Sequence, residues 1–190
     1  MGREFELKYQ AEEATLEQIG AAFGPFREIS METTYYDDAS RSLRQRRWTL
    51  RQRMENGKSI CTVKINLPDG SRGEWETEAA DIASAIPVLI AQGAPAALQG
   101  IAAQGLIATC GAKFTRRAAL LQTADGWAEL ALDSGVLTGG GRALPFAEVE
   151  LELKEGSDQA TADLAHVLAQ RFFLTPQPKS KLARALELAD

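Results

Sequence analysis

Histidine and cysteine are nearly absent from this sequence, which has one histidine and two cysteines in 190 residues. Zinc sites commonly draw on several histidines or cysteines, and a Ser-His-Asp triad needs a catalytic histidine, so the lone His166 argues against both. Cys61 and Cys110 lie far apart in the chain, which favours free thiols in a reducing compartment over a disulfide. We therefore expect a cytoplasmic protein whose chemistry depends on other side chains.

Long apolar segments are also missing. No apolar run approaches the ~20 residues that span a bilayer, and the start MGREFE lacks the apolar core of a signal peptide. The formal net charge of −5 argues against general nucleic-acid binding, which favours a strongly basic surface. Membranes and nucleic acids are therefore not expected as partners.

The composition that remains is that of an ordinary globular protein. Hydrophobic residues make up 45% of the chain and charged residues 25%, and the length is sufficient to bury a sizeable core. These values predict a single domain that covers residues 1–190.

Alternating segments and turn signals predict about eight strands, mostly antiparallel. Two hairpins are expected around Asn56-Gly57 and Asp125-Gly126, because these residue pairs favour tight turns. Together with intervening helices, the strands indicate an α+β domain built on a closed or nearly closed sheet. The predicted strands cover residues 3–10, 33–38, 48–54, 58–66, 72–78, 112–123, 127–135 and 146–156.

Helices are predicted between and around these strands. An apolar stripe predicts a helix over residues 12–23, and the Ala-rich segment at about 81–109 predicts short helices packed outside the sheet. Ser157 is a suitable N-cap for a helix that reaches about residue 173, with Leu164, Val167 and Leu168 facing inward. A turn and a short helix end the chain.

The predicted strands separate charged residues from apolar ones, because side chains alternate between the two faces. A sheet with one solvated face would show the same alternation. Two features favour a binding face over a merely solvated one. The polar face is almost entirely Glu, Arg and Lys, and same-face carboxylates such as Glu148 and Glu150 lie only ~7 Å apart and repel each other. Divalent cations on the carboxylates, and a polyanion on the Arg and Lys residues, would compensate this repulsion.

The chemistry that this charged face favours is metal-assisted attack of water on a phosphoanhydride. Guanidinium and ammonium groups hold phosphoryl oxygens, whereas hard oxygen ligands hold Mg²⁺ or Mn²⁺. The charged face includes Glu4, Glu6, Lys8, Arg51, Arg53, Lys64, Arg72, Glu74, Glu76, Glu129, Asp133, Glu148, Glu150, Glu152 and Lys154.

Short motifs follow one another along nearly the whole chain. They are Glu4-x-Glu6-x-Lys8, TYYDD at 34–38 with its preceding Thr33, Leu43-Arg44, Leu50-Arg51-x-Arg53, Thr62-x-Lys64, Arg72-x-Glu74, Phe114-Thr115-Arg116, Ala131-Leu132-Asp133, Glu148-x-Glu150-x-Glu152 and Ser180-Lys181-x-x-Arg184. In this order they resemble the motifs of the CYTH superfamily, the triphosphate tunnel metalloenzymes. A single ExExK would be a weak signal, whereas the full set in register is specific. The layout looks closest to that of bacterial inorganic triphosphatases.

This resemblance implies an eight-stranded antiparallel β-barrel, a tunnel with a charged lumen and helices packed outside, that binds a triphosphate with two Mg²⁺ or Mn²⁺ ions. The implied catalytic residues are Glu4, Glu6 and Lys8, of which Lys8 would position water or stabilise the scissile phosphate. The implied phosphate ligands are Lys8, Arg51, Arg53, Lys64, Arg72, Arg116, Lys181 and Arg184. The implied metal ligands are Glu4, Glu6, Glu74, Asp133, Glu148 and Glu150, with Glu76 and Glu152 as further candidates.

Two features depart from the family pattern. The closing motif continues as Arg184-Ala185-Leu186 where the family often has Arg-Gly-aromatic, which predicts a looser closing segment. Arg117 has no evident partner in the sequence, and strand alternation directs it outward to the surface.

Three activities of the family compete: inorganic triphosphatase, thiamine triphosphatase and class IV adenylate cyclase. A cyclase must also hold adenine and orient a 3′-hydroxyl, and no motif dedicated to that task is evident. The expected function is therefore hydrolysis of tripolyphosphate to pyrophosphate and phosphate. A polyphosphate- or nucleotide-binding module without turnover is the non-enzymatic alternative, and family habit makes a homodimer plausible.

Overall fold

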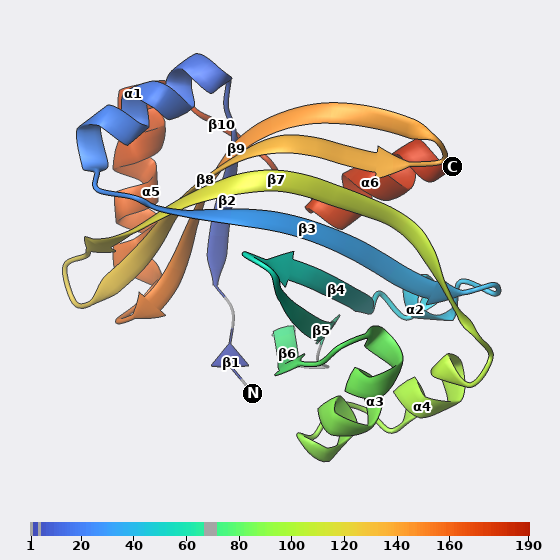
Figure 1. The fold of residues 1–190 in the computed structure, drawn as a ribbon. Helices are drawn as coiled ribbons and strands as arrows, with labels where there is room; N and C mark the ends of the chain where they lie inside the picture. The colour runs from blue at the N-terminus through green and yellow to red at the C-terminus, as the bar shows by residue number, and fades with distance from the viewer. Residues whose placement is uncertain (1, 4, 67–71) are drawn as a thin grey trace.

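The computed structural model describes residues 2–3, 5–66 and 72–190, and within them an α+β arrangement (Figure 1). The strands are β1 (Gly2–Arg3), β2 (Glu6–Gln10), β3 (Arg27–Asp38), β4 (Thr49–Glu55), β5 (Lys58–Asn66), β6 (Arg72–Glu78), β7 (Leu106–Gln122), β8 (Trp127–Gly139), β9 (Arg142–Glu155) and β10 (Thr175–Pro176). The helices are α1 (Glu13–Phe23), α2 (Ser42–Gln45), α3 (Ile82–Ala91), α4 (Ala97–Ala102), α5 (Asp158–Phe172) and α6 (Lys181–Ala189).

The strands form one antiparallel sheet in the order β1-β6-β5-β4-β3-β7-β8-β9-β2-β10. The sheet is not closed, so the eight-stranded barrel is not confirmed. It is nevertheless strongly curved, because Arg3 pairs with Gly73 of β6 while Glu6 pairs with Glu152 of β9. Three residues of chain span at most ~11 Å, so the two halves of the sheet must approach each other at the N-terminal segment.

Both predicted hairpins are present. Asn56 and Gly57 have φ angles of 48° and 87°, the left-handed backbone that a two-residue turn between twisted strands requires. The second hairpin joins β7 to β8 around Asp125-Gly126. Several strands are longer than the pattern predicted: β3 begins at Arg27, and β7 begins at Leu106 within the segment expected to be helical. Because β3 and β7 pair with each other over their whole length, their backbones stay extended even where the local sequence does not predict a strand.

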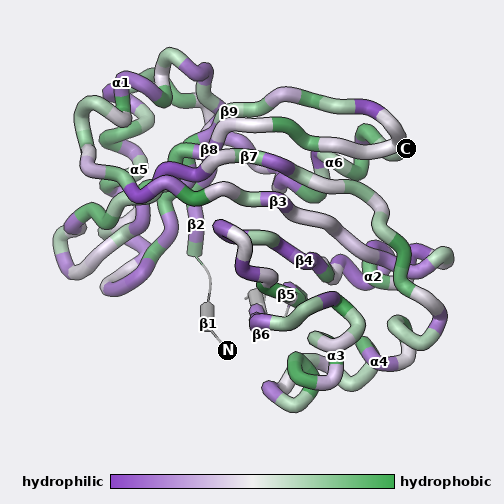
Figure 2. The backbone as a smooth tube through the Cα atoms, in the orientation of Figure 1, coloured by the Kyte–Doolittle hydropathy of each residue, from purple (hydrophilic) through white to green (hydrophobic). Residues whose placement is uncertain are grey.

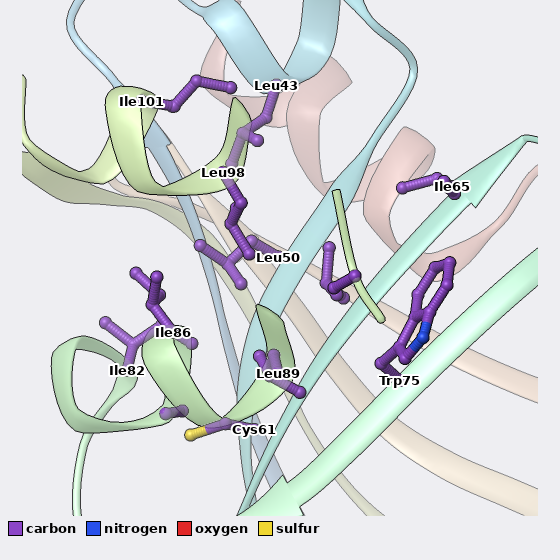
Figure 3. Packing of buried hydrophobic residues seen from close by; sticks show 13 residues of the cluster. Leu43, Leu50, Cys61, Ile65, Trp75, Ile82, Ile86, Leu89, Leu98 and Ile101 are labelled. Carbon is purple, nitrogen blue, oxygen red and sulfur yellow. The ribbon is translucent and has the colours of Figure 1, made fainter. Parts of the chain in front are cut away.

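The apolar faces of most strands point outward and are covered by helices, whereas β3 and the first half of β7 turn apolar residues to the concave side. On one side α3 and α4 pack over β4, β5 and β6, where Leu50 and Trp75 meet Leu89 and Leu98 (Figure 3). On the other side α1 and α5 cover β8, β9 and β2. Figure 2 shows hydrophilic and hydrophobic residues alternating along the long strands. On the strands that these helices cover, the charged residues face the concave side of the sheet, whereas Glu32 of β3 and Lys113 of β7 are exposed on the outer face, 3.5 Å apart.

Helix α6 departs from the expectation that all helices pack outside. It lies against the concave face of β7, β8 and β9, where Ala185 is fully buried with Phe114, Leu137 and Phe146. A Cβ atom at Gly139 would lie 2.3 Å from the Ala185 carbonyl oxygen, so the close approach requires glycine there. Helix α6 therefore fills one end of the concavity.

Helix α5 confirms the Ser157 N-cap, whose side chain accepts a hydrogen bond from the Ala160 backbone N–H. The expectation for Val167 was wrong, because its side chain is 57% exposed. The buried stripe instead follows Thr161, Ala165 and Leu168, which leaves Val167 on the opposite face. Among the described residues, no helix has the length and apolar character needed to cross a bilayer.

The fully buried Leu130, under α1 and α5, provides a test of this packing. Leu130→Ala is expected to lower the free energy of unfolding by about 2–5 kcal/mol, because the substitution removes buried methyl groups and leaves a cavity. The exposed Val167→Ala should change it by only about 0.5 kcal/mol. Urea denaturation measures both, and comparable losses would contradict the outward packing of β8.

Candidate active site

A cavity of about 440 Å³ lies on the concave side of the sheet. Side chains from β2 to β9 and from the start of α6 line it. Its lining is dominated by charged residues, which places the predicted charged face inside the molecule. The predicted site residues that line it are Glu6, Lys8, Arg51, Arg53, Lys64, Glu74, Glu76, Arg116, Glu150, Glu152 and Lys181.

Strand register brings opposite charges together on the β4-β5-β6 side of the cavity. Lys64 is paired with Glu74 across β5 and β6, and its Nζ lies 3.3 Å from the Glu74 carboxylate. The Arg51 guanidinium approaches the same carboxylate at 3.7 Å. Arg53 contacts Glu55 and lies 3.8 Å from Glu76. Each carboxylate here is thus held beside a cation.

Two arginines on this wall retain unused donor capacity. The Nε–H groups of Arg51 and Arg53 are buried and have no hydrogen-bond partner among the described residues. A buried N–H without a partner costs free energy, so these atoms are suited to an incoming anion. Burial and the adjacent Arg51 charge lower the pKa of Arg53, and a bound anion would relieve both effects.

The opposite wall contains a buried cluster of three carboxylates. Asp133, Glu148 and Glu150 are each at most 8% exposed, and their ligand oxygens lie within 4.8 Å of one another. Register explains this proximity, because Asp133 of β8 is paired directly with Glu148 of β9, two residues before Glu150. Like charges this close need compensation.

Three cations supply that compensation. Lys181, the first residue of α6, places its Nζ 2.7 Å from Asp133 and 2.8 Å from Glu150, and also contacts Glu148. Arg116 donates to both oxygens of Asp133 at 2.8 and 2.7 Å and to Glu150. Arg184 donates to Glu148. The three formal negative charges are therefore matched by three positive ones.

The pKa shifts follow from this arrangement. Burial alone would raise the pKa of Glu150, but Lys181 and Arg116 outweigh it and hold that pKa well below its ordinary value. Burial would lower the pKa of Lys181, but Asp133 and Glu150 raise it instead. Burial raises the pKa of Glu148 despite the neighbouring lysine. Glu150 and Lys181 thus carry full, opposite charges at neutral pH.

The donor chemistry of the site fits a hard divalent cation. The buried cluster and the cavity-lining Glu6, Glu74 and Glu152 offer only carboxylate oxygens, the ligand type that Mg²⁺ and Mn²⁺ prefer. Within the cluster a metal ion would compete with the Lys181 ammonium for the same oxygens.

The structure places some predicted residues elsewhere. Asp133, Glu148 and Arg184 lie behind the cavity lining, in the ion-pair cluster, rather than facing the cavity. Glu4 and the side chain of Arg72 lie outside the described residues, so those two assignments remain predictions.

Sequence reasoning missed other lining residues. Arg27 lines the cavity from the start of β3, which no pattern marked as a strand, and Glu55 lies at the end of β4, where a turn was expected. Glu129 and Lys154 were recognised on the charged face but given no role, although both line the cavity. Their strand alternation was the signal that could have assigned them.

The two departures from the family pattern have structural explanations. Ala185, in place of glycine, is fully buried against Gly139, so the closing segment is tightly packed and the expected loosening is wrong. Arg117 points outward as expected, and its guanidinium lies 3.0 Å from Glu17 of α1. It therefore helps to fix α1 against the sheet.

Removing the Lys181 charge tests the ion-pair cluster. Lys181→Met is expected to cost about 3–5 kcal/mol of unfolding free energy, because it leaves buried carboxylates uncompensated. Lys179→Met is the matched control, since Lys179 pairs with Glu187 on the surface and should contribute at most about 1 kcal/mol. Equal losses in the two variants, measured by chemical denaturation, would contradict a structural role for Lys181.

Comparison with known proteins gives a consistent result. The CYTH domain matches residues 2–186. A candidate adenylyl cyclase from Hippeastrum, HpAC1, described with a dominant triphosphatase activity, is similar with a TM-score of 0.69 and 17% identity, covering 100% of this chain and 97% of its own. The PH1819 protein from Pyrococcus horikoshii gives 0.66 and 22%, covering 97% and 98%.

A candidate adenylate cyclase from Bacillus halodurans gives a TM-score of 0.65 with 18% identity, covering 95% of this chain and 96% of its own. At these identities the structural likeness shows the shared fold. The family match extends over nearly the whole sequence and includes the strands that build the cavity. This chain therefore belongs to the CYTH family.

Proposed function

We propose that this protein hydrolyses inorganic triphosphate to pyrophosphate and phosphate in a metal-dependent reaction within the charged cavity. The observation that carries the proposal is the cavity lining itself: basic side chains from β2, β4, β5, β7 and α6 converge with carboxylates around a cavity of about 440 Å³. A small, highly charged anion matches such a lining better than a larger, mainly apolar ligand.

The basic residues would bind the phosphoryl oxygens. Arg51 and Arg53 have buried Nε–H groups without a hydrogen-bond acceptor among the described residues. Lys64 of β5 and Arg116 of β7 line the same cavity. Guanidinium forks bind phosphate with two parallel hydrogen bonds, which fixes the orientation of the substrate as well as its charge. Their present carboxylate partners would be exchanged for phosphoryl oxygens when substrate binds.

The carboxylates would hold divalent metal. Glu6, Glu74 and Glu152 line the cavity, and Asp133, Glu148 and Glu150 form the adjacent cluster. A bound divalent ion neutralises phosphate charge and makes water a better nucleophile. Lys8 lies opposite Glu150 in the register and contacts Glu6 at 3.0 Å, which supports a role for Lys8 in orienting the attacked phosphate or the attacking water.

Two enzymatic alternatives remain within the same cavity. Thiamine triphosphatase would need the same phosphate ligands, and a class IV adenylate cyclase would also need a site that orients the ribose 3′-hydroxyl. The Hippeastrum neighbour is described with a dominant triphosphatase activity although it is a candidate cyclase, which supports hydrolysis as the first expectation. A binding module without turnover is disfavoured, because pure anion binding would not call for so many carboxylates in the lining.

Product analysis separates these activities. The protein is incubated with Mg²⁺ or Mn²⁺ and with tripolyphosphate, ATP or thiamine triphosphate, and phosphate, pyrophosphate and cyclic AMP are measured. The proposal expects phosphate and pyrophosphate in equal amounts from tripolyphosphate, abolished by EDTA. Cyclic AMP from ATP would establish a cyclase instead, and inertness toward all three substrates would favour the binding module.

Glu6→Gln tests the role of the carboxylates. The substitution keeps the size of the side chain but removes the charge, so we expect turnover to fall at least ~100-fold, about 2.7 kcal/mol in transition-state stabilisation. Far-UV circular dichroism should remain unchanged. Glu28→Gln is the control, because Glu28 lies on the same sheet but faces away from the cavity. Full activity in Glu6→Gln would contradict the assignment.

A further inference from the structure

The concave face does not end where the charged cavity ends. On β7 and β8 it continues toward the Asp125-Gly126 hairpin, and its character changes from charged to apolar. Leu120 is paired with the cavity-lining Glu129, and Trp127 lies two residues beyond Glu129 on the same strand. Because residues two apart share a face, Leu120, Glu129 and Trp127 all belong to the concave side.

The intervening residues confirm this direction. Ala128 and Leu130 are fully buried in the outer core beneath α1 and α5, so the alternate positions 127 and 129 must face the other way. Leu121, the partner of Ala128, packs against the same outer core, which directs Leu120 inward. The pairing of β8 with β9 shifts by one residue near Trp127, and the extra residue lies on β9. Side chains along β8 therefore still alternate between the two faces of the sheet.

Both apolar side chains on this face are unusually exposed. Leu120 is 60% exposed and Trp127 is 42% exposed. They are diagonal neighbours across the β7–β8 ladder, a relation that places two side chains ~7–8 Å apart, close enough to contact one flat group together. The two residues, defined here as the apolar rim, lie beside Glu129 at the edge of the charged cavity.

The opposite end of the concavity is closed to any group that extends from the cavity. Helix α6 covers it, with Ala185 buried against Gly139 and Lys181 held in the carboxylate cluster. A substrate group too large for the cavity would therefore extend away from α6, and the apolar rim lies on that side. Arg27 and Glu129, 3.9 Å apart, mark the boundary between the cavity and the apolar rim on that side.

We propose that Leu120 and Trp127 form a specificity subsite that binds the flat aromatic group of an organic triphosphate whose phosphates occupy the cavity. The inference rests on the proposed function for the phosphate site and assigns to two residues outside that site the selection among triphosphate substrates. An indole face stacks on any aromatic heterocycle, and Leu120 supplies apolar contact beside it. Tripolyphosphate has no such group and does not reach the rim.

The kinetic test compares substrates with and without an aromatic group. Leu120→Ala and Trp127→Ala are assayed with tripolyphosphate, ATP and thiamine triphosphate in the presence of Mg²⁺. We expect KM for the aromatic substrate that the wild type turns over to rise ~10-fold in Trp127→Ala, which corresponds to ~1.4 kcal/mol. KM for tripolyphosphate should change less than ~2-fold, and kcat should be unaffected.

Val167→Ala is the matched control for Leu120→Ala, because Val167 is similarly exposed but lies on α5, away from the rim. It should leave every KM unchanged. Equal effects of Trp127→Ala on tripolyphosphate and on the aromatic triphosphates would overturn the subsite, since they would indicate a general disturbance of the cavity.

Binding measurements keep this test separate from the proposed hydrolysis. Quenching of tryptophan fluorescence by ATP or thiamine triphosphate should be strong in the wild type and weak in Trp127→Phe, whereas tripolyphosphate should quench little in either. Failure to hydrolyse tripolyphosphate would refute the proposed function but leave this readout valid. Absence of binding by both aromatic triphosphates, or quenching that survives Trp127→Phe, would refute the subsite.

Discussion

The ion-pair cluster between Lys181, Arg116 and Arg184 and the carboxylates of β8 and β9 is the interaction on which the rest of this structure depends. It places the first turn of α6 inside the curved sheet, and the apolar packing of Ala185 continues that attachment. Buried charges of one sign are costly, so the cluster is stable only as a whole. The same cluster fixes the back of the cavity, which ties the shape of the site to the attachment of one helix.

Most strands have their apolar face outside and their charged face inside, whereas β3 and the first half of β7 place apolar residues on the concave side, where α6 packs. Two separate outer cores, one under α3 and α4 and one under α1 and α5, stabilise the strands from behind. A third hydrophobic cluster lies on the concave face itself, between α6 and the strands β3, β7, β8 and β9. Charged side chains converge beside this cluster in the cavity, where less water screens their interactions than on an exposed surface.

Much of this arrangement could be predicted from local pattern. The hairpin at Asn56-Gly57, the Ser157 cap and the charged faces of β4, β5 and β9 are local features, and the structure confirms them. The predictions that failed have one cause in common: each concerned a feature that depends on contacts with residues far away in the sequence. The start of β3 at Arg27 depends on pairing with β7, and the exposure of Val167 depends on how α5 rotates against the sheet. Neither partner is visible in the local sequence.

The sequence by itself determined which side chains share a face, because alternation along a strand is a property of the backbone. It therefore identified most of the charged strand residues that line the cavity. Only the tertiary structure decided how far the sheet closes, that α6 lies within it, and which cation compensates which carboxylate. These outcomes depend on strand register and curvature, which bring Lys181 to Asp133 across 48 positions of sequence, a distance that no local pattern spans.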